Sequence, residues 1–436
     1  MITKPKGCHD IYGMEAKKWN YISRLIDEVC EKYNYKFIRT PIFESSELFH
    51  RGVGETTDIV TKETYDFKDR GDRDITLRPE GTAGVVRSYI ENKMYGDATQ
   101  PVKLYYNGTM YRYERPQSGR DRELTQFGVE VLGSDDPMID AEVISLAVNI
   151  YKLVGLKQIK VNINSLGDKE SRDNYRNALV EYFKPHINEM CEDCQVRLDK
   201  NPLRILDCKV DHESDIMKNA PKITDYLNEE SKKRFEAVQK YLDLLDIEYV
   251  VDPNVVRGLD YYDHTVFEIE AAVKDFGAQN VLGAGGRYNG LVKQLGGPDV
   301  PGIGFASGLG RLMLALDKEG IVILDATHIN SELRVDRNQE LKSLFDKLYL
   351  VVWNIDRLVV SNQNLQRDYP IPPEAMNMFF SKFELPDEKD KAFFDHIIYI
   401  NSVLTSVSLF APRAYLSVRH HRFGYREVIA DLSCEG

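Results

Sequence analysis

The sequence RYERPQSGRDRELTQFGVEVLG, at residues 112–133, indicates both the fold and the site of this chain. Its second half alternates apolar with polar or small residues, which places Gln126 and Glu130 on one face of an extended strand. Residues 102–113 are rich in aromatic and β-branched side chains, and PQSG is typical of a turn, so the region predicts a long β-hairpin. Four arginines surround the turn, and together with the polar strand face they predict a site for a polyphosphate and a small polar ligand. The alternative is a solvated hairpin whose arginines only aid solubility.

Length and composition indicate a large globular protein. The chain has 436 residues, of which 42% are hydrophobic and 29% charged, so we expect two or three domains. No apolar run approaches the ~20 residues of a membrane span, the first residues lack the apolar core of a signal peptide, and the six cysteines do not form a disulfide framework. These features predict a cytoplasmic location. The net charge of -12 argues against general coating of nucleic acid, yet it allows a local basic groove for a specific RNA.

Further elements are predicted on both sides of the hairpin. Apolar spacing predicts a helix over residues 16–33 and strands over residues 36–43, 75–77, 265–269 and 302–307. Glu80 stands at the start of a helix, where a carboxylate either caps the helix or contacts a ligand. An apolar stripe from Leu309 to Leu316 predicts another helix, and Arg311 lies off that stripe, either solvated or against a nucleotide. Residues 283–290 are rich in glycine, which allows close approach of a ligand, but they lack a Walker lysine.

Residues from about 168 to 245 turn polar and helical, which indicates an insertion. Cys191, Cys194, Cys208 and His212 within it imitate the spacing of zinc ligands. Only one C-x-x-C pair is present, and a local group of thiols in a helical insertion is common. We therefore expect no metal here.

These segments, taken in order, resemble the class II aminoacyl-tRNA synthetases over about residues 1–320. The opening helix and the strand that contains Pro41 resemble motif 1 of that class, residues 112–133 resemble motif 2, and residues 302–316 resemble motif 3. Motifs 1 and 3 are weak individually, and their order along the chain strengthens them.

Within that class the chain resembles the histidyl-tRNA synthetases. RGLDYY at residues 257–262 and GGRY at residues 285–288 are similar to the two segments peculiar to histidyl enzymes, and RPEGTAG at residues 78–84 adds to the resemblance. The resemblance implies an α+β fold in which helices flank an antiparallel sheet. It implies a catalytic domain at 1–325, interrupted by the helical insertion, and a C-terminal α/β domain at 326–436.

The resemblance also implies a two-step reaction that uses ATP, with Mg²⁺ as its counter-ion, and joins L-histidine to tRNA(His) in a homodimer formed through motif 1. The histidine carboxylate attacks the α-phosphorus of ATP, which gives histidyl-adenylate and pyrophosphate, and the terminal ribose of the tRNA then accepts the histidyl group. Such a transfer needs positioning and positive charge near the phosphate oxygens. A forked, permanently charged guanidinium supplies both.

Site residues follow from the same resemblance. Two arginines near the α-phosphate, Arg257 and Arg112, would be catalytic. The residues that would bind ATP are Arg112, Glu114, Arg120 and Arg311, of which Glu114 and Arg311 would lie at adenine and Arg120 at the outer phosphates. The loop at the tip of the hairpin would meet the acceptor end of the tRNA through Gln117 and Arg122.

The amino-acid side of the site is implied in the same way. The residues that would bind histidine are Glu80, Gly81, Thr82, Arg112, Gln126, Glu130, Arg257, Tyr261 and Tyr262. Glu80, Thr82 and Gln126 would hold the α-ammonium group, while Glu130 and Tyr262 would reach the imidazole. A neutral imidazole has one donor and one acceptor, so a carboxylate paired with a phenol can read both nitrogens. Such a site rejects ligands that lack these hydrogen bonds, and no editing site is required.

Three positions depart from the family pattern in the part of the chain that resembles it. Gly310 stands where motif 3 usually has a glutamate, Asn289 stands where the glycine-rich segment usually has an aspartate, and Thr64 replaces a more usual methionine. A glycine in the first turn of a helix costs about 1 kcal/mol relative to alanine, so we expect a looser setting of Arg311 and weakened ATP binding.

The last 110 or so residues depart further, because the motifs of the family's anticodon-binding domain are not found there. Residues 332–348 are predicted to form a helix, and residues 350–353 and 397–400 buried strands. A group of basic residues interleaved with aromatic ones either contacts RNA or forms a solvated strand edge. Its members are Arg413, Tyr415, Arg419, His420, His421, Arg422, Phe423, Tyr425 and Arg426.

A second interpretation is a catalytically idle paralogue, of the type of the regulatory subunit of ATP phosphoribosyltransferase, which senses histidine and has no anticodon domain. The unfamiliar C-terminal region favours it. Against it, Arg112, Arg120, Arg257 and Arg311 would have no purpose in a sensor that never handles ATP. A synthetase for another amino acid conflicts with Glu130 and the paired tyrosines.

Overall fold

The computed structural model describes most of the chain up to residue 319 and separate segments beyond it. The described residues are 2–54, 57, 59–116, 119–156, 158–206, 208, 210–211, 214–255, 261–272 and 280–319, followed by 322–325, 345–353, 388–393, 396–400, 414–420 and 428–431. The chain divides into two compact units, one of residues 1–10 and 22–314 and the other of residues 11–21 and 315–436. No helix among the described residues is long and apolar enough to cross a membrane.

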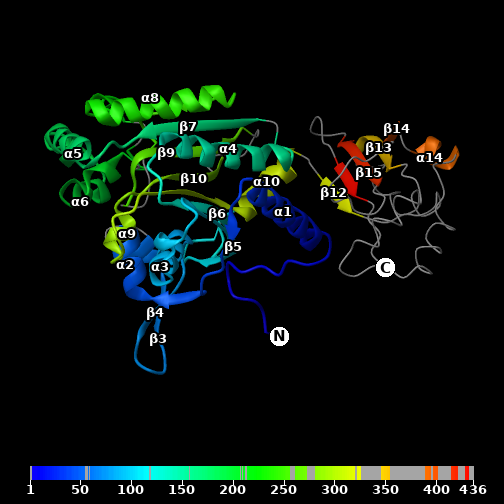
Figure 1. Ribbon diagram of the computed structural model, residues 1–436, viewed down its shortest axis with the longest axis horizontal. Helices are drawn as coiled ribbons and strands as arrows, with labels where there is room; N and C mark the ends of the chain where they lie inside the picture. The colour runs from blue at the N-terminus through cyan, green and yellow to red at the C-terminus, as the bar shows by residue number, and fades with distance from the viewer. Residues whose placement is uncertain are drawn as a thin grey trace. The chain divides into compact units, whose positions relative to one another are not determined.

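An eight-stranded sheet forms the body of the first unit (Figure 1). Its strands, in spatial order, are β1 (Lys36–Phe37), β5 (Val102–Tyr111), β6 (Glu123–Leu132), β11 (Gly302–Gly308), β10 (Val281–Arg287), β9 (Asp263–Ala271), β7 (Ile159–Ser165) and β8 (Val250–Val251). Only β1 and β8, at the two edges, run parallel to their neighbours. The predicted hairpin is therefore present as β5 and β6, and the predicted antiparallel sheet flanked by helices is confirmed.

The two faces of this sheet differ in the size of their side chains. On one face Phe127 and Phe305 meet edge to face, and helix α4 (Pro137–Leu153) packs there, where Tyr151 donates a hydrogen bond to Ser307 at 2.8 Å. Cross-strand pairing places small residues in a row on the other face: Gly128, Ala306 and Ala284 in one line, and Gly304 and Gly286 in the next. Helix α3 (Thr82–Glu91) packs on this second face, since its Val85 contacts Leu104 and Tyr106 of β5.

The remaining elements of the first unit differ from the prediction in detail. Helix α1 spans Gly13–Lys32, close to the predicted 16–33. The strand predicted over 36–43 is two short strands, β1 and β2 (Phe43–Ser45), because Pro41 lies between them. β2 joins β3 (Tyr65–Lys68) and β4 (Asp74–Leu77) in a second sheet, and helices α2 (Ser46–Val53) and η1 (Ile59–Glu63) lie between these strands in the chain. Helices α9 (Leu291–Gln294) and α10 (Leu309–Glu319) follow β10 and β11.

Helices occupy the predicted insertion. They are α5 (Lys169–Phe183), η3 (Ile187–Glu189), α6 (Glu192–Lys200), η4 (Pro202–Ile205), α7 (Asp215–Lys218), η5 (Ile223–Asp225) and α8 (Glu229–Leu244). A separate apolar cluster, which includes Tyr175, Phe183, Met190 and Ile205, holds the first of them together. Short helices make up most of the described segment between α5 and α8, so its order depends on this apolar cluster, which contains ten buried residues.

The second unit contains strands that the structure describes individually. β12 (Val322–Asp325) pairs in parallel with β16 (Val428–Asp431), and β13 (Phe345–Trp353) pairs in parallel with β14 (His396–Ile400) and antiparallel with β15 (Ala414–His420). A short helix, α14, spans Glu388–Phe393.

The predicted strands at 350–353 and 397–400 are present. The predicted helix over 332–348 is wrong for residues 345–348, which begin β13. Their pairing with β15 outweighs the helical spacing of the apolar residues. The other residues of the predicted helix lie outside the described part of the chain. Of the basic and aromatic group, only Tyr415, Arg419 and His420 lie in a described strand.

A buried ion pair ties α4 to the sheet. Asp140 of α4 and Arg287 of β10 are both 0% exposed, and Arg287 Nη2 lies 2.5 Å from Asp140 Oδ1. Thr265 donates a hydrogen bond to the second carboxylate oxygen of Asp140 at 2.7 Å, and Arg287 donates another to the carbonyl of Ser134 at 2.9 Å. Arg234 Nη2 also lies 3.5 Å from Asp140 Oδ2, and Arg287 Nη1 lies 3.5 Å from the more exposed Asp135. Asp140 is thus the nearer and more deeply buried of the two acids that compensate Arg287.

Replacement Asp140→Asn should lower the free energy of unfolding by about 3 kcal/mol, because it removes the buried counter-charge of Arg287 and leaves only the longer contact with the more exposed Asp135. Urea denaturation followed by circular dichroism measures the change. The matched control is Asp299→Asn, since Asp299 pairs with Lys293 at the surface and such pairs contribute little. Equal stability losses in the two variants would contradict the structural role of the buried pair.

Candidate functional site

The row of small residues on the α3 side of the sheet makes room for other side chains. A Cβ atom on Gly304 would lie 1.9 Å from the Oε2 atom of Glu130, and one on Gly128 would lie 2.5 Å from the hydroxyl of Tyr106. Side chains of β5 and β6 therefore lie over backbone of neighbouring strands. This arrangement needs glycine at both positions, because any larger residue would displace a polar group of the site.

Glu130 is the central acid of the site and is 1% exposed. Thr82 donates a hydrogen bond to its Oε1 atom at 2.7 Å, and the hydroxyl of Tyr288 donates a short one to its Oε2 atom. Burial raises the pKa of Glu130 to about 8; the bonds from Tyr288 and Thr82 oppose this rise, and the nearby charge of Glu80 adds to it. The charged form of Glu130 is therefore disfavoured unless a ligand supplies a further donor or a positive charge.

Glu80 and Gly81 shape the start of α3. The Glu80 carboxylate accepts hydrogen bonds from the backbone N–H of Thr82 at 2.7 Å and of Ala83 at 2.8 Å, so it caps the helix. A Cβ on Gly81 would lie 2.3 Å from the ring of Tyr106, which explains the glycine. Burial raises the pKa of Glu80, while these N–H groups and the Arg112 charge lower it. The capping role is thus observed, and it fixes Thr82 against Glu130.

Gln126 lies on the same strand face as Glu130, toward the tip of the hairpin. Its side-chain carbonyl is buried and has no hydrogen-bond partner among the described residues. A buried acceptor without a partner costs free energy, which a donor on a ligand would recover. Gln126 is therefore suited to accept a hydrogen bond from an ammonium group.

Three buried tyrosines, Tyr261, Tyr262 and Tyr288, lie beside Glu130. The rings of Tyr261 and Tyr262 lie 4.6 Å apart, and the rings of Tyr261 and Tyr288 lie 5.7 Å apart in an edge arrangement. Burial raises the pKa of Tyr261 and Tyr288, and the charge of Glu130 raises both further, so these two tyrosines are neutral donors. Sequence reasoning gave Tyr288 no role, because only the pairing of β10 with β11 shows that it reaches Glu130.

The predicted nucleotide residues come together beside this pocket. Arg311 donates hydrogen bonds to the carbonyls of Val281 at 2.9 Å and Gly119 at 3.3 Å. Burial lowers its pKa, and the charges of Arg120 and Arg112 lower it further, while Glu114 raises it. Arg120 lies 3.5 Å from Glu114, and Arg112 donates from Nε to the carbonyl of Pro79 at 2.8 Å. A concentration of mutually repelling cations is a typical receptor for a polyphosphate.

Of the two predicted tRNA contacts, the structure describes Arg122. The Arg122 guanidinium lies 3.9 Å from the centre of the Tyr113 ring and donates to the carbonyl of Glu114 at 3.1 Å, so it is engaged within the protein. Gln117 and the predicted catalytic Arg257 lie outside the described residues. The roles of all three stay predictions.

The departures from the family pattern have local explanations. Asn289 donates its side-chain N–H to Asp135 at 3.2 Å and its backbone N–H to Asp263 at 3.1 Å, so an aspartate here would face two carboxylates. A Cβ on Gly310 would contact nothing within 4 Å, so no packing requires the glycine. Thr64 donates to Asp66 at 2.6 Å. None of these contacts disturbs the bonds that hold Arg311.

Comparison with known proteins agrees with the geometry. A family model described as Histidyl-tRNA synthetase matches residues 7–312. A histidine–tRNA ligase from Anoxybacillus flavithermus is 61% identical over 317 residues, 73% of this chain and 75% of the relative. Another, from Oceanobacillus iheyensis, is 56% identical over 352 residues, 79% of this chain and 82% of the relative. The crystal structure of apo histidyl-tRNA synthetase from S. aureus is 47% identical, covers 78% of this chain and 83% of its own, and has a TM-score of 0.62. The chain therefore belongs to the histidyl-tRNA synthetase family.

Proposed function

We propose that this chain joins L-histidine to tRNA(His) through a histidyl-adenylate intermediate. Family membership supports the proposal, as do relatives with 56–61% identity that are named histidine–tRNA ligases. The observation that carries it is the contact of the arginine cluster with the backbone beside the buried acids: Arg112 Nε donates to the carbonyl of Pro79, the residue before Glu80, and Thr82 joins Glu80 to Glu130. A reaction between ATP and a small polar amino acid needs these two environments in contact.

The arginine cluster would bind ATP and stabilise the charge that develops at the α-phosphorus. Arg112 is held by a carbonyl through Nε, which leaves its outer nitrogens to contact the α-phosphate, and Arg120 would contact the outer phosphates. Glu114 and Arg311 would contact adenine. Mg²⁺ bound to ATP would screen the phosphate charges. Arg257 would join Arg112 as the second catalytic arginine.

The acid pocket would bind histidine. Gln126, with its unpaired carbonyl, would accept from the α-ammonium group, and Glu80 and Thr82 would lie on the same side. Glu130 would face the imidazole with Tyr262, and Tyr261 would pack close by. Both oxygens of Glu130 already accept a hydroxyl, so an imidazole N–H must use a remaining lone pair. Tyr288, which sets the direction of that carboxylate, is added here as a positioning residue.

The regulatory paralogue is the less supported alternative. A histidine sensor needs the buried acids but has no use for Arg112, Arg120 and Arg311, and the charges of the first two lower the pKa of the third. Glu114, 3.5 Å from Arg120, offsets part of this repulsion, and a bound polyphosphate would offset more of it. The arginine cluster therefore favours the ligase.

We also propose a cytoplasmic homodimer that binds tRNA. Three large apolar residues near β1 and β2 are exposed on the chain, namely Phe37, Ile42 and Phe43, and they lie in the segment that resembles motif 1. Exposed apolar surface of this kind is suited to an interface between two copies. The acceptor end of the tRNA would approach the tip of the hairpin, near Gln117 and Arg122.

The decisive experiment is ATP–pyrophosphate exchange with the purified full chain, without tRNA, testing histidine against the other amino acids. We expect exchange with histidine alone, because the acid pocket reads the imidazole and the arginine cluster binds ATP. Absence of exchange alongside measurable histidine binding would favour the sensor. Exchange with a different amino acid would contradict the assignment of Glu130.

Replacement Glu130→Gln should raise the KM for histidine about 10–100-fold, with a smaller effect on the KM for ATP. A lost hydrogen bond to a charged group costs about 1.5–3 kcal/mol, and the amide cannot accept from both Thr82 and Tyr288. Steady-state exchange kinetics give both constants. Glu91→Gln, on the exposed side of α3, serves as the control and should leave both unchanged. An unaltered histidine requirement in Glu130→Gln would remove Glu130 from the histidine site.

Replacement Arg311→Ala should raise the KM for ATP by about 10–100-fold, because a charge-assisted contact is lost. Histidine binding measured by calorimetry without ATP should stay unchanged. Arg176→Ala, an exposed arginine of α5, is the charge-matched control. If the two variants bound ATP equally well, Arg311 would have no part in the nucleotide site.

A further inference from the structure

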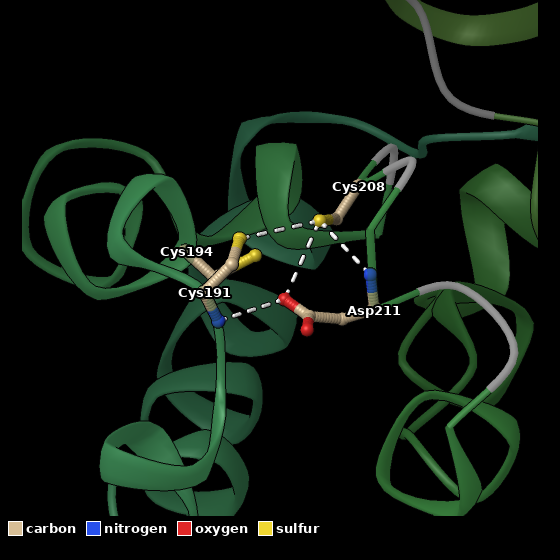
Figure 2. Close-up of side chains that lie close together, drawn as sticks. All are labelled: Cys191, Cys194, Cys208 and Asp211. Atoms are coloured by element: carbon tan, nitrogen blue, oxygen red, sulfur yellow. Dashed lines mark hydrogen bonds between the residues drawn. The ribbon is translucent and has the colours of Figure 1, made fainter.

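The helical insertion contains a second group of reactive side chains, far along the chain from the site described above. Cys191, Cys194, Cys208 and Asp211 turn their sulfur and carboxylate atoms toward one another (Figure 2). All four candidate ligand atoms lie within 4.8 Å of one another. Cys191 caps the start of α6 and Cys194 lies in its first turn, whereas Cys208 and Asp211 come from the segment after η4. The group thus joins two separate segments of the insertion.

The distances within this group match those around a tetrahedral zinc ion. The sulfur atoms of Cys191 and Cys208 lie 3.6 Å apart, and the sulfur of Cys208 lies 3.4 Å from Asp211 Oδ2. Zinc bonds of about 2.3 Å to sulfur and about 2.0 Å to oxygen, at tetrahedral angles, place two sulfurs about 3.8 Å apart and a sulfur and an oxygen about 3.5 Å apart. The side chains therefore need little movement to coordinate an ion.

The spacing of the four residues is that of two matched half-sites. Cys191 and Cys194 form C-x-x-C, and Cys208 and Asp211 form C-x-x-D, in which aspartate takes the place of the fourth cysteine. Sequence reasoning counted a single C-x-x-C pair and took His212 as the fourth member, and His212 lies outside the described residues. A backbone N–H of Asp211 donates to the sulfur of Cys208 at 3.4 Å, so the two residues of this half-site also contact each other directly.

Two simpler explanations account for less of the arrangement. Buried thiols can act as small apolar residues, and Cys194 and Cys208 are 0% and 3% exposed within the apolar cluster of the insertion. That explanation accounts for the carboxylate only as a hydrogen-bond acceptor, since Asp211 Oδ2 accepts from the backbone N–H of Cys191 at 3.1 Å and from the thiol of Cys208 at 3.4 Å. It does not account for three thiols that gather around the same carboxylate. A disulfide would use two of three thiols and leave the third beside the carboxylate, and it needs sulfurs about 2.05 Å apart.

We propose that Cys191, Cys194, Cys208 and Asp211 bind one Zn²⁺ ion that holds the insertion together. Three thiolates and one carboxylate complete a four-coordinate shell from protein ligands alone, which is typical of a structural rather than a catalytic zinc site. Cys194 and Cys208 belong to the apolar cluster on which the short helices of the insertion pack, so an ion that joins α6 to the segment after η4 would add a direct link where these segments meet.

The test begins with zinc content. Untagged full chain, purified without chelators, should contain one zinc per chain by mass spectrometry of the native protein and by elemental analysis. Cys194→Ser and Asp211→Asn should each lose most of the metal. Cys30→Ser is the matched control, since Cys30 is a buried free thiol of α1 outside the group, and it should keep the full content. His212→Gln should also keep it.

Cobalt substitution uses the wild-type chain, so it tests the ligand set even if a variant fails to fold. Zinc removed from the wild-type chain by a chelator and replaced by Co²⁺ should give the sulfur-to-cobalt charge-transfer bands and intense visible bands of a tetrahedral thiolate site. Removal of the zinc should lower the protection of residues in α6 and after η4 in hydrogen exchange, and added Zn²⁺ should restore it.

Three results would overturn the proposal. The first is a wild-type chain that stays free of metal and shows no cobalt bands when Zn²⁺ or Co²⁺ is supplied under reducing conditions. The second is equal metal content in Cys194→Ser and Cys30→Ser. The third, loss of metal in His212→Gln but not in Asp211→Asn, would reject Asp211 as the fourth ligand.

Discussion

The buried carboxylate of Glu130 is the constraint on which the rest of the site depends. A carboxylate inside a sheet needs both space and donors, since burial strongly disfavours its charged form. Gly304 supplies the space, because its missing side chain leaves the volume that Glu130 Oε2 occupies. Thr82 and Tyr288 supply the donors. These three residues come from β11, from the start of α3 and from the end of β10, so the carboxylate fixes how these elements meet.

The two polar environments of the site have opposite electrostatic character. The acid pocket holds Glu80 and Glu130 with raised pKa, whereas the neighbouring arginine cluster lowers the pKa of Arg311 through burial and mutual repulsion. Each environment is destabilised alone, and a ligand with an ammonium group and a phosphate chain would relieve both. This preorganisation is what a reaction between an amino acid and ATP requires, since the protein supplies position and charge rather than covalent chemistry.

The insertion stands apart from this site in its means of stabilisation. The catalytic sheet buries large aromatic residues on one face and an ion pair between Asp140 and Arg287, whereas the helices around α6 pack on their own apolar cluster of ten buried residues, two of which are cysteines of the proposed zinc site. Metal ligands are a common supplement to the packing of short helices. The proposed zinc site would therefore serve the order of the insertion and not the chemistry of adenylate formation.

The sequence by itself determined the hairpin, helices near residues 16–33 and 309–316, strands near residues 75–77, 265–269 and 302–307, the helical insertion, and the residue types of the site. Helix α4 and strands β7 and β10 were not predicted. Period-two alternation from Gln126 to Glu130 and the stripe from Leu309 to Leu316 are local patterns, and local patterns reveal which face of an element is buried. Only the tertiary structure decided the pairing of Gly304 with Glu130, the contact of Tyr288 with that carboxylate, and the meeting of Asp211 with three cysteines. These depend on strand register and on contacts between segments distant in the chain, which no local periodicity encodes. The helix predicted up to residue 348 failed for the same reason, because pairing with another strand overrode local spacing at residues 345–348.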